Sequence, residues 1–393
     1  MTLFERSERI FFETYRRLPV NVTSGNGAIL IGDDGTEYID LIGGIAVNSV
    51  GYGNKRVLSA ISEQMERYIH LSNLFVQEPQ VRLAEALVRH SGYDRVFFTN
   101  SGTEAIEAAI KLCRKWGSSS GKHTLVGFSG SFHGRTMGSL SLMDREKYRK
   151  GYEPFLPDVL HLPFNDAAAL HSSINGETVS VFLEFLQGEG GINSASRSFI
   201  DALFDLREKY SFLVVADEIQ SGIGRTGKFF AFEHWGVSPD LVVTAKPIGG
   251  GMPLGALLGR EEFSSVFGIG GHGTTFGGNP VACAAGIAVV EEIMNGGLMK
   301  RARENGEYFK QKLMEIKDAH PRKVRDVRGF GLMLGMEVAG DCREITKSCL
   351  EKGLLITCTR DTVLRIVPPL VIGREEINRA TAILEEVIQG HGS

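Results

Sequence analysis

The amine of Lys246 is a group that could do covalent chemistry. It follows the apolar run 241–244 and precedes Pro247 and three consecutive glycines, residues 249–251. Such a run predicts a buried strand, and a lysine is almost never fully buried without a partner. Lys246 is therefore either the first solvated residue after a strand or the centre of a binding site.

Two carboxylates occupy a similar position, because Asp217 and Glu218 directly follow the apolar run 212–216. A carboxylate at the end of a buried strand costs desolvation free energy unless a cation or a hydrogen bond compensates for it. An aspartate there could hold a protonated ring nitrogen, but it could equally bind a metal ion or cap a helix. Glu184, inside an apolar run, and Glu189, in a glycine-rich loop, are further candidate carboxylates.

Ser101, Gly102 and Thr103 lie where a strand-like run ends and a helical pattern begins. Free amides at a helix N-terminus favour an anion such as a phosphate group, and glycine lets the backbone approach it. Serine and threonine are also common N-caps, so a cap alone would explain them. The segment is neither a GxGxxG nor a P-loop pattern, and a nucleotide is not implied.

Aromatic and basic side chains occupy the loop 128–138. Phe132 or His133 could stack on a planar ligand, and Arg135 could grip a carboxylate. The alternative is a plain surface loop with a solvated arginine. Arg365, which interrupts the apolar run 363–370, is a second candidate for carboxylate recognition.

Pyridoxal phosphate is the ligand that would use all of these groups. It needs a lysine that bonds to its aldehyde, an acid that keeps its ring nitrogen protonated, and a site for its phosphate. An amino-acid substrate would also need an arginine for its carboxylate. This chemistry requires no metal ion and no thiol nucleophile.

The elements that must position these groups alternate between helices and strands. The strands lack polar alternation, so they predict an α/β fold with a mostly parallel sheet covered by helices on both faces. Ligands of such sheets bind beyond the carboxyl ends of the strands, where the glycine-rich segments lie. The predicted helices are 55–67, 80–90, 103–115 and 199–210, and the predicted strands are 95–100, 124–128, 180–185, 212–216 and finally 241–244.

The two ends of the chain have different patterns. Residues 27–41 predict a hairpin with an Asp-Asp-Gly turn. The C-terminal part predicts helices at 298–318 and 374–389 with short strands at 331–338 and 364–367. We therefore predict an N-terminal segment, residues 1–50, that packs with a small C-terminal α+β domain, residues 298–393. The large ligand-binding domain spans residues 51–297.

The composition indicates an ordinary globular protein. Of the 393 residues, 42% are hydrophobic and 23% charged, and the formal net charge of −4 gives no sign of a nucleic-acid or membrane-surface protein. No apolar run approaches the roughly 18 residues of a membrane span, and charges interrupt the N-terminus where a signal peptide needs an apolar core. Five scattered cysteines suggest neither a disulfide framework nor a zinc site, so we expect a cytoplasmic protein in a reducing compartment.

Six ordered segments resemble the class III aminotransferases, a fold type I family that depends on pyridoxal phosphate. They are NSGTEA, FHGRT, QGEGG, DEIQSGIGRTG, AKPIGGGMPLGA and HGTTFGGNP, and the resemblance runs from about Gly27 to Leu370. It implies ping-pong transamination of small amino-acid and 2-oxo-acid substrates, in a homodimer whose sites form at the subunit interface.

The resemblance also implies a role for each candidate residue. Lys246 would bond to the cofactor and move the proton, Asp217 would pair with the ring nitrogen, and Glu189 would pair with Arg365 when an ω-amine enters. The remaining cofactor-binding residues would be Ser101, Gly102, Thr103, Phe132 as the stacking ring, His133, Gln220 near the phenolic oxygen, and Thr275 from the neighbouring subunit. Arg135 and Arg365 would bind substrate carboxylates.

Within the class, residues 44–51 and 73–80 are most similar to acetylornithine aminotransferases. Gly44 stands where ornithine aminotransferases usually carry a tyrosine, and a small residue leaves room for an acylated substrate. Ornithine, succinylornithine, 4-aminobutyrate and other ω-amino acids are the alternatives. The chain departs from the family pattern at Pro247, at residues 184–187 and at residues 51–55, and no catalytic group is lost there.

Overall fold

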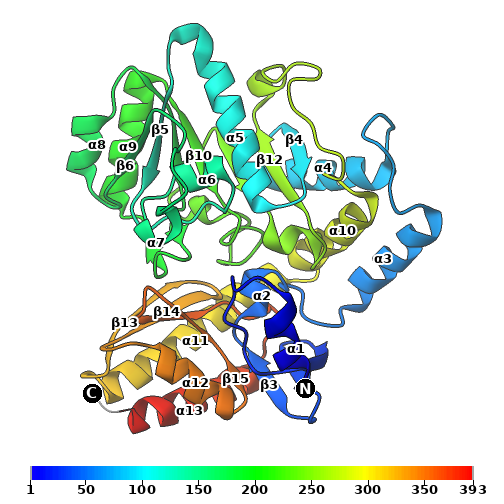
Figure 1. Ribbon diagram of the computed structural model, residues 1–393, viewed down its shortest axis with the longest axis vertical. Helices are drawn as coiled ribbons and strands as arrows, with labels where there is room; N and C mark the ends of the chain where they lie inside the picture. Colours follow the sequence, from blue (N-terminus) through cyan, green and yellow to red (C-terminus); the bar gives the residue numbers. More distant parts are fainter. Residues whose placement is uncertain (1, 392–393) are drawn as a thin grey trace.

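The computed structural model describes residues 2–391, so the predicted domain ends at residues 1 and 393 lie outside the described residues. Figure 1 shows two lobes, an upper one with the middle of the chain and a lower one with both ends. The division at residues 50 and 297 stays a prediction. No single helix in residues 2–391 is long and apolar enough to cross a membrane, although α10 (Pro280–Met294) and α11 (Leu298–Ala319), bent by 58°, pass that test as a pair.

A seven-stranded sheet forms the centre of the upper lobe, with the order β4-β12-β11-β10-β7-β5-β6. Every neighbouring pair is parallel except those of β12, which is antiparallel to β11 and to β4. The predicted mostly parallel sheet is thus confirmed. Its strands are β4 (Arg95–Thr99), β5 (Thr124–Phe128), β6 (Val159–Leu162), β7 (Thr178–Leu183), β10 (Leu213–Asp217), β11 (Leu241–Thr244) and β12 (Gly255–Gly259).

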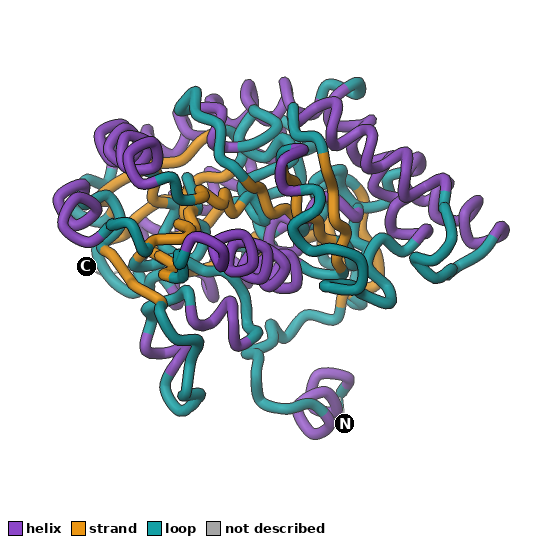
Figure 2. Tube along the Cα trace, turned by 90° about the horizontal axis from the view of Figure 1, so that it is seen from above, coloured by secondary structure: helices purple, strands orange, loops and turns teal. Residues whose placement is uncertain are grey.

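Both faces of this sheet are apolar, which explains why its strands lack polar alternation. In β10, Leu213 and Val215 face one buried cluster together with the residues of α5, whereas Val214 and Ala216 face another with α9 and α10. Seen from above, the helices surround the strands (Figure 2). The helices of this lobe are α3 (Lys55–Arg67), α4 (Glu78–Ser91), α5 (Gly102–Gly117), α6 (Met137–Ser141), α7 (Glu146–Arg149), α8 (Ala167–Ser173), α9 (Arg197–Tyr210) and α10 (Pro280–Met294).

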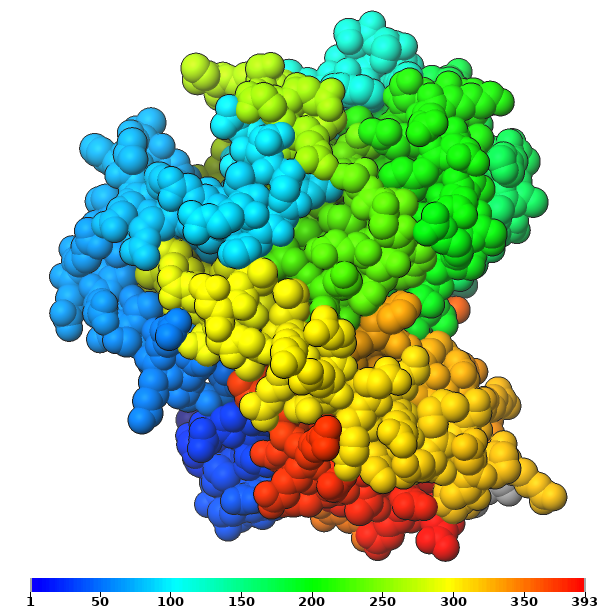
Figure 3. All heavy atoms as spheres, turned by 180° about the vertical axis from the view of Figure 1, so that it is seen from behind, coloured from blue at the N-terminus to red at the C-terminus, as the bar shows by residue number. Residues whose placement is uncertain are grey.

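The lower lobe joins the two ends of the chain. A four-stranded sheet of order β1-β2-β3-β15 pairs Ile39 of β3 with Leu354 of β15 in parallel, so the predicted hairpin adds to a C-terminal strand. From behind, the red C-terminal surface lies against the blue N-terminal surface (Figure 3). The elements of this sheet are β1 (Val22–Asn26), β2 (Ile29–Gly32), β3 (Glu37–Asp40) and β15 (Leu354–Leu355).

A second, antiparallel sheet of the lower lobe has the order β13-β14-β17-β16. Its strands are β13 (Val324–Phe330), β14 (Met333–Val338), β16 (Thr357–Thr359) and β17 (Val363–Ile366), and the helices around it are α11 (Leu298–Ala319), α12 (Arg343–Glu351) and α13 (Arg374–Gly390). The remaining elements are α1 (Leu3–Ile10), α2 (Gly43–Ala46), β8 (Leu186–Gln187), β9 (Asn193–Ser194), and the 3-10 helices η1 (Ser118–Ser120), η2 (Ala231–His234), η3 (Lys246–Gly249) and η4 (Glu261–Phe263).

Two expectations from the sequence are wrong. The strand 241–244 does not complete the large sheet, because β12, a short strand between two glycines, follows it and pairs with it. The scattered cysteines do form one disulfide, between Cys342 and Cys358, because the start of α12 lies beside β16. Spacing along the chain could not reveal that neighbourhood.

Candidate active site

A cavity of about 390 Å³ lies beyond the ends of β10 and β11, where the sequence places its candidate residues. Of the predicted set, ten residues line it: Ser101, Gly102, Thr103, Phe132, His133, Arg135, Glu189, Asp217, Gln220 and Lys246. Arg365 joins them through an ion pair with Glu189. Thr275 does not line the cavity of its own chain; it is exposed on a separate loop.

Lys246 follows β11 after one residue and opens η3, and its φ of +33° lies in the left-handed region. A residue before proline rarely takes this conformation, so the backbone at Lys246 is strained. Burial, reinforced by the positive charge of Arg365, lowers the pKa of Lys246 from 10.5 to about 8. At pH 7 about a tenth of this amine is therefore neutral, far more than for an ordinary lysine, and this fraction can act as a nucleophile or base.

Asp217 is the last residue of β10, and its carboxylate is 3% exposed. Its Oδ2 lies 2.7 Å from Nδ1 of His133, and its Oδ1 accepts a hydrogen bond from the amide of Ile219 at 3.1 Å. Burial alone lowers the pKa of His133, but the hydrogen bond and charge of Asp217 outweigh it and raise the pKa. His133 thus orients the Asp217 carboxyl group at the cavity, and a carboxylate is the partner that a protonated ring nitrogen needs.

His133 is not available as a stacking ring, because its side chain has no exposed surface. Phe132, the other residue predicted as a stacking ring, is half-buried and lines the cavity. Arg135 is exposed at the mouth, with its guanidinium 5.2 Å from the centre of the Phe132 ring and 4.2 Å from that of Tyr148. Within residues 2–391 the contacts of that guanidinium are these two rings and no carboxylate, so its donors are available to a ligand.

Glu218, adjacent to Asp217, serves the fold. It is fully buried, and its two oxygens accept hydrogen bonds from the amides of Ala231 and Phe232 and from the hydroxyl of Ser221. Burial raises the pKa of Glu218 to about 7. The alternative interpretation of this carboxylate pair, a helix cap, therefore applies to Glu218, which caps η2, while Asp217 faces the cavity.

The N-terminus of α5 presents backbone amides to the cavity. Ser101 is its N-cap and accepts a hydrogen bond from the amide of Glu104 at 3.3 Å, so the plain capping interpretation is correct for this residue. The amides of Gly102 and Thr103, in the first turn, find no backbone acceptor within residues 2–391. The Thr103 hydroxyl bonds to Thr136 at 2.9 Å and Ser139 at 2.8 Å, so the amides are the more available donors.

Arg365 and Glu189 form an ion pair that spans the two lobes. Arg365, on β17, is 4% exposed, and its Nη1 pairs with Oε1 of Glu189 in the loop after β8. Burial raises the pKa of Glu189, but the charge and hydrogen bond of Arg365 outweigh it, so the pKa lies below its ordinary value. This paired carboxylate can cover the arginine or release it for another carboxylate.

Glu184 is the group in the cavity whose role the sequence did not predict. Its oxygens accept hydrogen bonds from the amides of Phe132 at 2.9 Å and Gly188 at 3.1 Å, which fixes the two loops that carry Phe132 and Glu189. Burial, with the nearby charge of Asp217, raises its pKa to about 7. The sequence feature that could have indicated this role is the position of Glu184, a carboxylate that interrupts an apolar run.

The chain belongs to the class III aminotransferases. The profile of the family described as "Aminotransferase class-III" matches residues 11–388. Acetylornithine aminotransferase from Aquifex aeolicus is 44% identical over 95% of this chain and 98% of its own length, and that from Archaeoglobus fulgidus is 42% identical over 98% and 100%. The solved ornithine aminotransferase from Toxoplasma gondii ME49 superimposes with a TM-score of 0.94, at 30% identity over 98% of this chain and 94% of its own.

Pyridoxal phosphate is the cofactor of this family, and the residues of the cavity fit it. Two buried polar atoms, Oε1 of Gln220 and Nε2 of His133, have no hydrogen-bond partner within residues 2–391. Together with the free amides of α5, the carboxylate of Asp217 and the amine of Lys246, they form a donor and acceptor set that suits a charged, planar, phosphorylated ring.

Proposed function

We propose that this enzyme transfers the δ-amino group of N2-acetylornithine to 2-oxoglutarate, giving N-acetylglutamate 5-semialdehyde and glutamate, by a ping-pong mechanism. The observation that carries the proposal is the Glu189–Arg365 pair in the cavity of Lys246. An ω-amine substrate presents no α-carboxylate at the reacting end, whereas the 2-oxo acid does, so one arginine must be covered and uncovered in turn. The relatives named acetylornithine aminotransferase support this choice.

In this proposal the cofactor, when bound, supplies an aldehyde that accepts the amino group and a ring that withdraws electrons from the reacting carbon. Gly102, Thr103 and Ser101 would hold its phosphate, Phe132 would lie against its ring, and Gln220 would donate to its phenolic oxygen. Asp217, held by His133, would keep its ring nitrogen protonated. Lys246 would hold the cofactor, and its amine would carry the proton to and from the substrate carbon.

Substrate carboxylates are assigned to the two arginines. Arg135, at the exposed mouth, receives the α-carboxylate of acetylornithine, while Glu189 neutralises Arg365. In the second half-reaction Glu189 moves aside and Arg365 binds the α-carboxylate of the 2-oxo acid in a forked geometry. The site then returns to its first state with glutamate as product.

A substrate panel tests the proposal. Purified holoenzyme is assayed with 2-oxoglutarate and acetylornithine, succinylornithine, ornithine, 4-aminobutyrate or lysine, and kcat/KM is compared. We expect acetylornithine to give the highest value. A higher kcat/KM for 4-aminobutyrate or ornithine would reject this substrate, and the absence of turnover with every amine would reject the transaminase mechanism.

A homodimer is part of the proposal, with Thr275 of each subunit reaching the phosphate of the other. Thr275 is exposed next to Phe276, which is 58% exposed, and an adjoining loop exposes Leu74, Phe75 and Val76. Asn73 donates to the carbonyls of Thr274 and Gly277, so the two loops form one apolar surface. Surfaces of this kind mark protein contacts. Sedimentation should give twice the 43.0 kDa chain mass, and a monomer with a complete cofactor site would contradict the arrangement.

We also propose a cytoplasmic location, which cell fractionation with compartment markers would test.

A further inference from the structure

We propose that Thr357 and Thr359 position the Glu189–Arg365 pair, and that the Cys342–Cys358 disulfide holds these threonines in place. Reduction of the disulfide then weakens binding of the 2-oxo acid. The inference rests on the proposed function, because it assigns a redox-dependent property to the carboxylate end of the same site.

Both threonines lie on β16 and contact the two members of the pair. In the antiparallel register Thr357 is directly opposite Arg365, and its Oγ1 accepts a hydrogen bond from Nε of Arg365 at 3.3 Å. The hydroxyl of Thr359 donates to the main-chain oxygen of Glu189 at 2.8 Å. One three-residue strand therefore orients the side chain of the arginine and the backbone of the glutamate.

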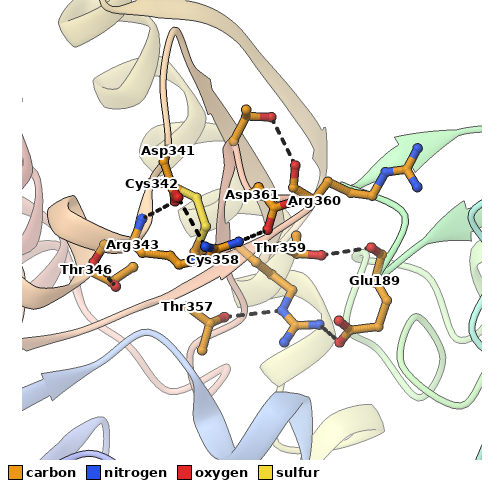
Figure 4. Close-up of a disulfide and its surroundings, with 12 residues drawn as sticks. Glu189, Asp341, Cys342, Arg343, Thr346, Thr357, Cys358, Thr359, Arg360 and Asp361 are labelled. Carbon is orange, nitrogen blue, oxygen red and sulfur yellow. Dashed lines mark hydrogen bonds and ion pairs between the residues drawn. A yellow bond between two sulfur atoms is a disulfide. The ribbon is translucent and has the colours of Figure 1, made fainter. Parts of the chain in front are cut away.

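Cys358 lies between the two threonines. Successive side chains of a strand point to opposite faces, so Cys358 leaves the strand on the face away from the ion pair. On that side it bonds to Cys342, the N-cap residue of α12, as Figure 4 shows. The disulfide thus connects the face of β16 that points away from the ion pair to the start of α12.

The other contacts of β16 are its antiparallel pairing with β17, through Thr357, Cys358 and Thr359, and those of the loop that follows it. Within residues 2–391 it is the last strand in the order β13-β14-β17-β16, so no strand lies beside its other edge. Beyond it, Arg343 pairs with Asp361, but these side chains are 55% and 59% exposed, and such pairs contribute little. The amide of Cys342 also donates to the carbonyl of Asp361 at 2.8 Å. The disulfide, which closes a separation of 16 residues, adds a covalent restraint on the side of β16 that faces α12.

A dithiol reductant can reach the bond from the side of Cys358, which is half-buried, whereas Cys342 is fully buried. One thiolate of the reductant attacks the sulfur of Cys358, and the protein S–S bond breaks with the sulfur of Cys342 leaving as a thiolate. The second thiol of the reductant then displaces Cys358. Two electrons and two protons pass to the protein, and the reductant becomes a disulfide.

Release of β16 affects the two substrates differently. The 2-oxo acid needs a correctly oriented Arg365, and Thr357 holds its Nε. Acetylornithine reacts while Glu189 still covers Arg365, and the groups that do the chemistry, Lys246 and Asp217, lie at the ends of strands in the upper lobe. Reduction should therefore raise KM for the 2-oxo acid more than it changes kcat.

The holoenzyme is assayed after oxidation and after treatment with dithiothreitol, with new thiols counted to confirm that two appear. Since one hydrogen bond of ordinary net strength, long at 3.3 Å, is involved, reduction should raise KM for 2-oxoglutarate about three- to tenfold, with kcat and KM for acetylornithine within about twofold. Reoxidation should reverse the change. Thr357→Val should show the raised KM while still oxidised.

Cysteine variants test whether the change in KM depends on the Cys342–Cys358 disulfide. The double variant Cys342→Ser, Cys358→Ser should have the raised KM with or without dithiothreitol. Cys349→Ser is the matched control, because Cys349 is a free, buried cysteine on the same helix, α12, and this variant should respond like the unmodified protein. A response that persists in the double variant, or an unchanged KM after complete reduction, would overturn the proposal.

Hydrogen exchange gives a result that does not depend on turnover. Reduction should speed amide exchange in residues 354–362 and leave residues 241–250 unchanged, and equal exchange in both redox states would also overturn the proposal. If the holoenzyme has no acetylornithine activity in either state, the proposed function fails, while the exchange measurement still decides whether the disulfide restrains β16.

Discussion

The end of the cavity that holds Lys246 and Asp217 differs from the end that holds Glu189 and Arg365 in how its parts are brought together. Lys246 and Asp217 follow adjacent parallel strands, and the register that pairs Asp217 with Val243 fixes their spacing. Glu189 and Arg365 are 176 residues apart and come from different lobes. The register of a sheet therefore fixes the relative positions of the residues at one end, whereas the packing of two lobes fixes those at the other.

This difference separates two kinds of function. A sheet is rigid, so the cofactor end suits groups that must keep one position throughout the reaction. The ion pair at the other end joins a loop of the upper lobe, which carries Glu189, to a strand of the lower lobe, which carries Arg365. Such a pair can open, which suits a group that must serve two substrates in turn. The predictions below test whether chemistry and substrate selection divide along this line.

The largest effect should come from Lys246→Ala. Without the amine, the cofactor has no covalent attachment and the proton has no carrier, so kcat should fall by at least about 10³-fold. Borohydride treatment of the unmodified enzyme should fix the cofactor to the peptide containing Lys246, as mass spectrometry would show. A variant that stays fully active would refute the assignment of this lysine.

Asp217→Asn should be the next most severe change. It leaves the shape intact but removes the charge that faces His133 and the ring nitrogen, and an unpaired buried cation costs about 3–5 kcal/mol. We expect kcat to fall about 10²-fold or more and the cofactor to dissociate more readily. Glu218→Gln is the matched control next to it: this change should lower thermal stability while kcat stays close to that of the unmodified enzyme.

Arg365→Gln and Glu189→Gln should change KM instead of the chemistry. Loss of the arginine removes a charge-assisted contact, so KM for 2-oxoglutarate should rise about 10- to 100-fold while the visible cofactor band remains. Glu189→Gln uncovers the arginine, so KM for 2-oxoglutarate should fall and α-amino acids should compete better with acetylornithine. Equal losses of kcat in both variants would remove the distinction between the two ends.

The pH dependence of cofactor attachment links the two ends. Because the pKa of Lys246 is lowered to about 8, its neutral, reactive fraction grows about tenfold per pH unit below that value and levels off above it. Stopped-flow absorbance of the apoenzyme with added cofactor should follow this curve. Since Arg365 helps to lower the pKa, Arg365→Gln should move the midpoint to higher pH, and an unmoved midpoint would mean that the two ends are electrostatically independent.

Pro247→Gly should have the smallest effect. Pro247 is buried in η3 and follows the strained Lys246, so its replacement relaxes the turn without removing a catalytic group. Changes of this kind amount to about 0.4–1 kcal/mol, so kcat/KM should change by less than about fivefold for every substrate. A change confined to one substrate would instead assign Pro247 a role in specificity.

The sequence pattern of short segments was enough to predict many strands and helices of this protein and several residues of the cavity. Apolar runs with both faces buried predicted the parallel strands, and α3, β5 and β11 have the predicted bounds. Lys246, Asp217 and the start of α5 were also predicted, because a polar residue just after a buried strand lies where such sheets bind ligands. Each of these inferences needs only a few neighbouring residues.

Contacts between distant segments were decided by the tertiary structure alone. The ion pair between Glu189 and Arg365 came from family resemblance and has no local signature, and the pairing of Asp217 with His133 spans 84 residues. The Cys342–Cys358 disulfide was missed because nothing in the spacing shows that α12 begins beside β16. Sequence pattern specifies which residues end a strand or cap a helix, whereas the packing of whole elements decides which of those residues meet.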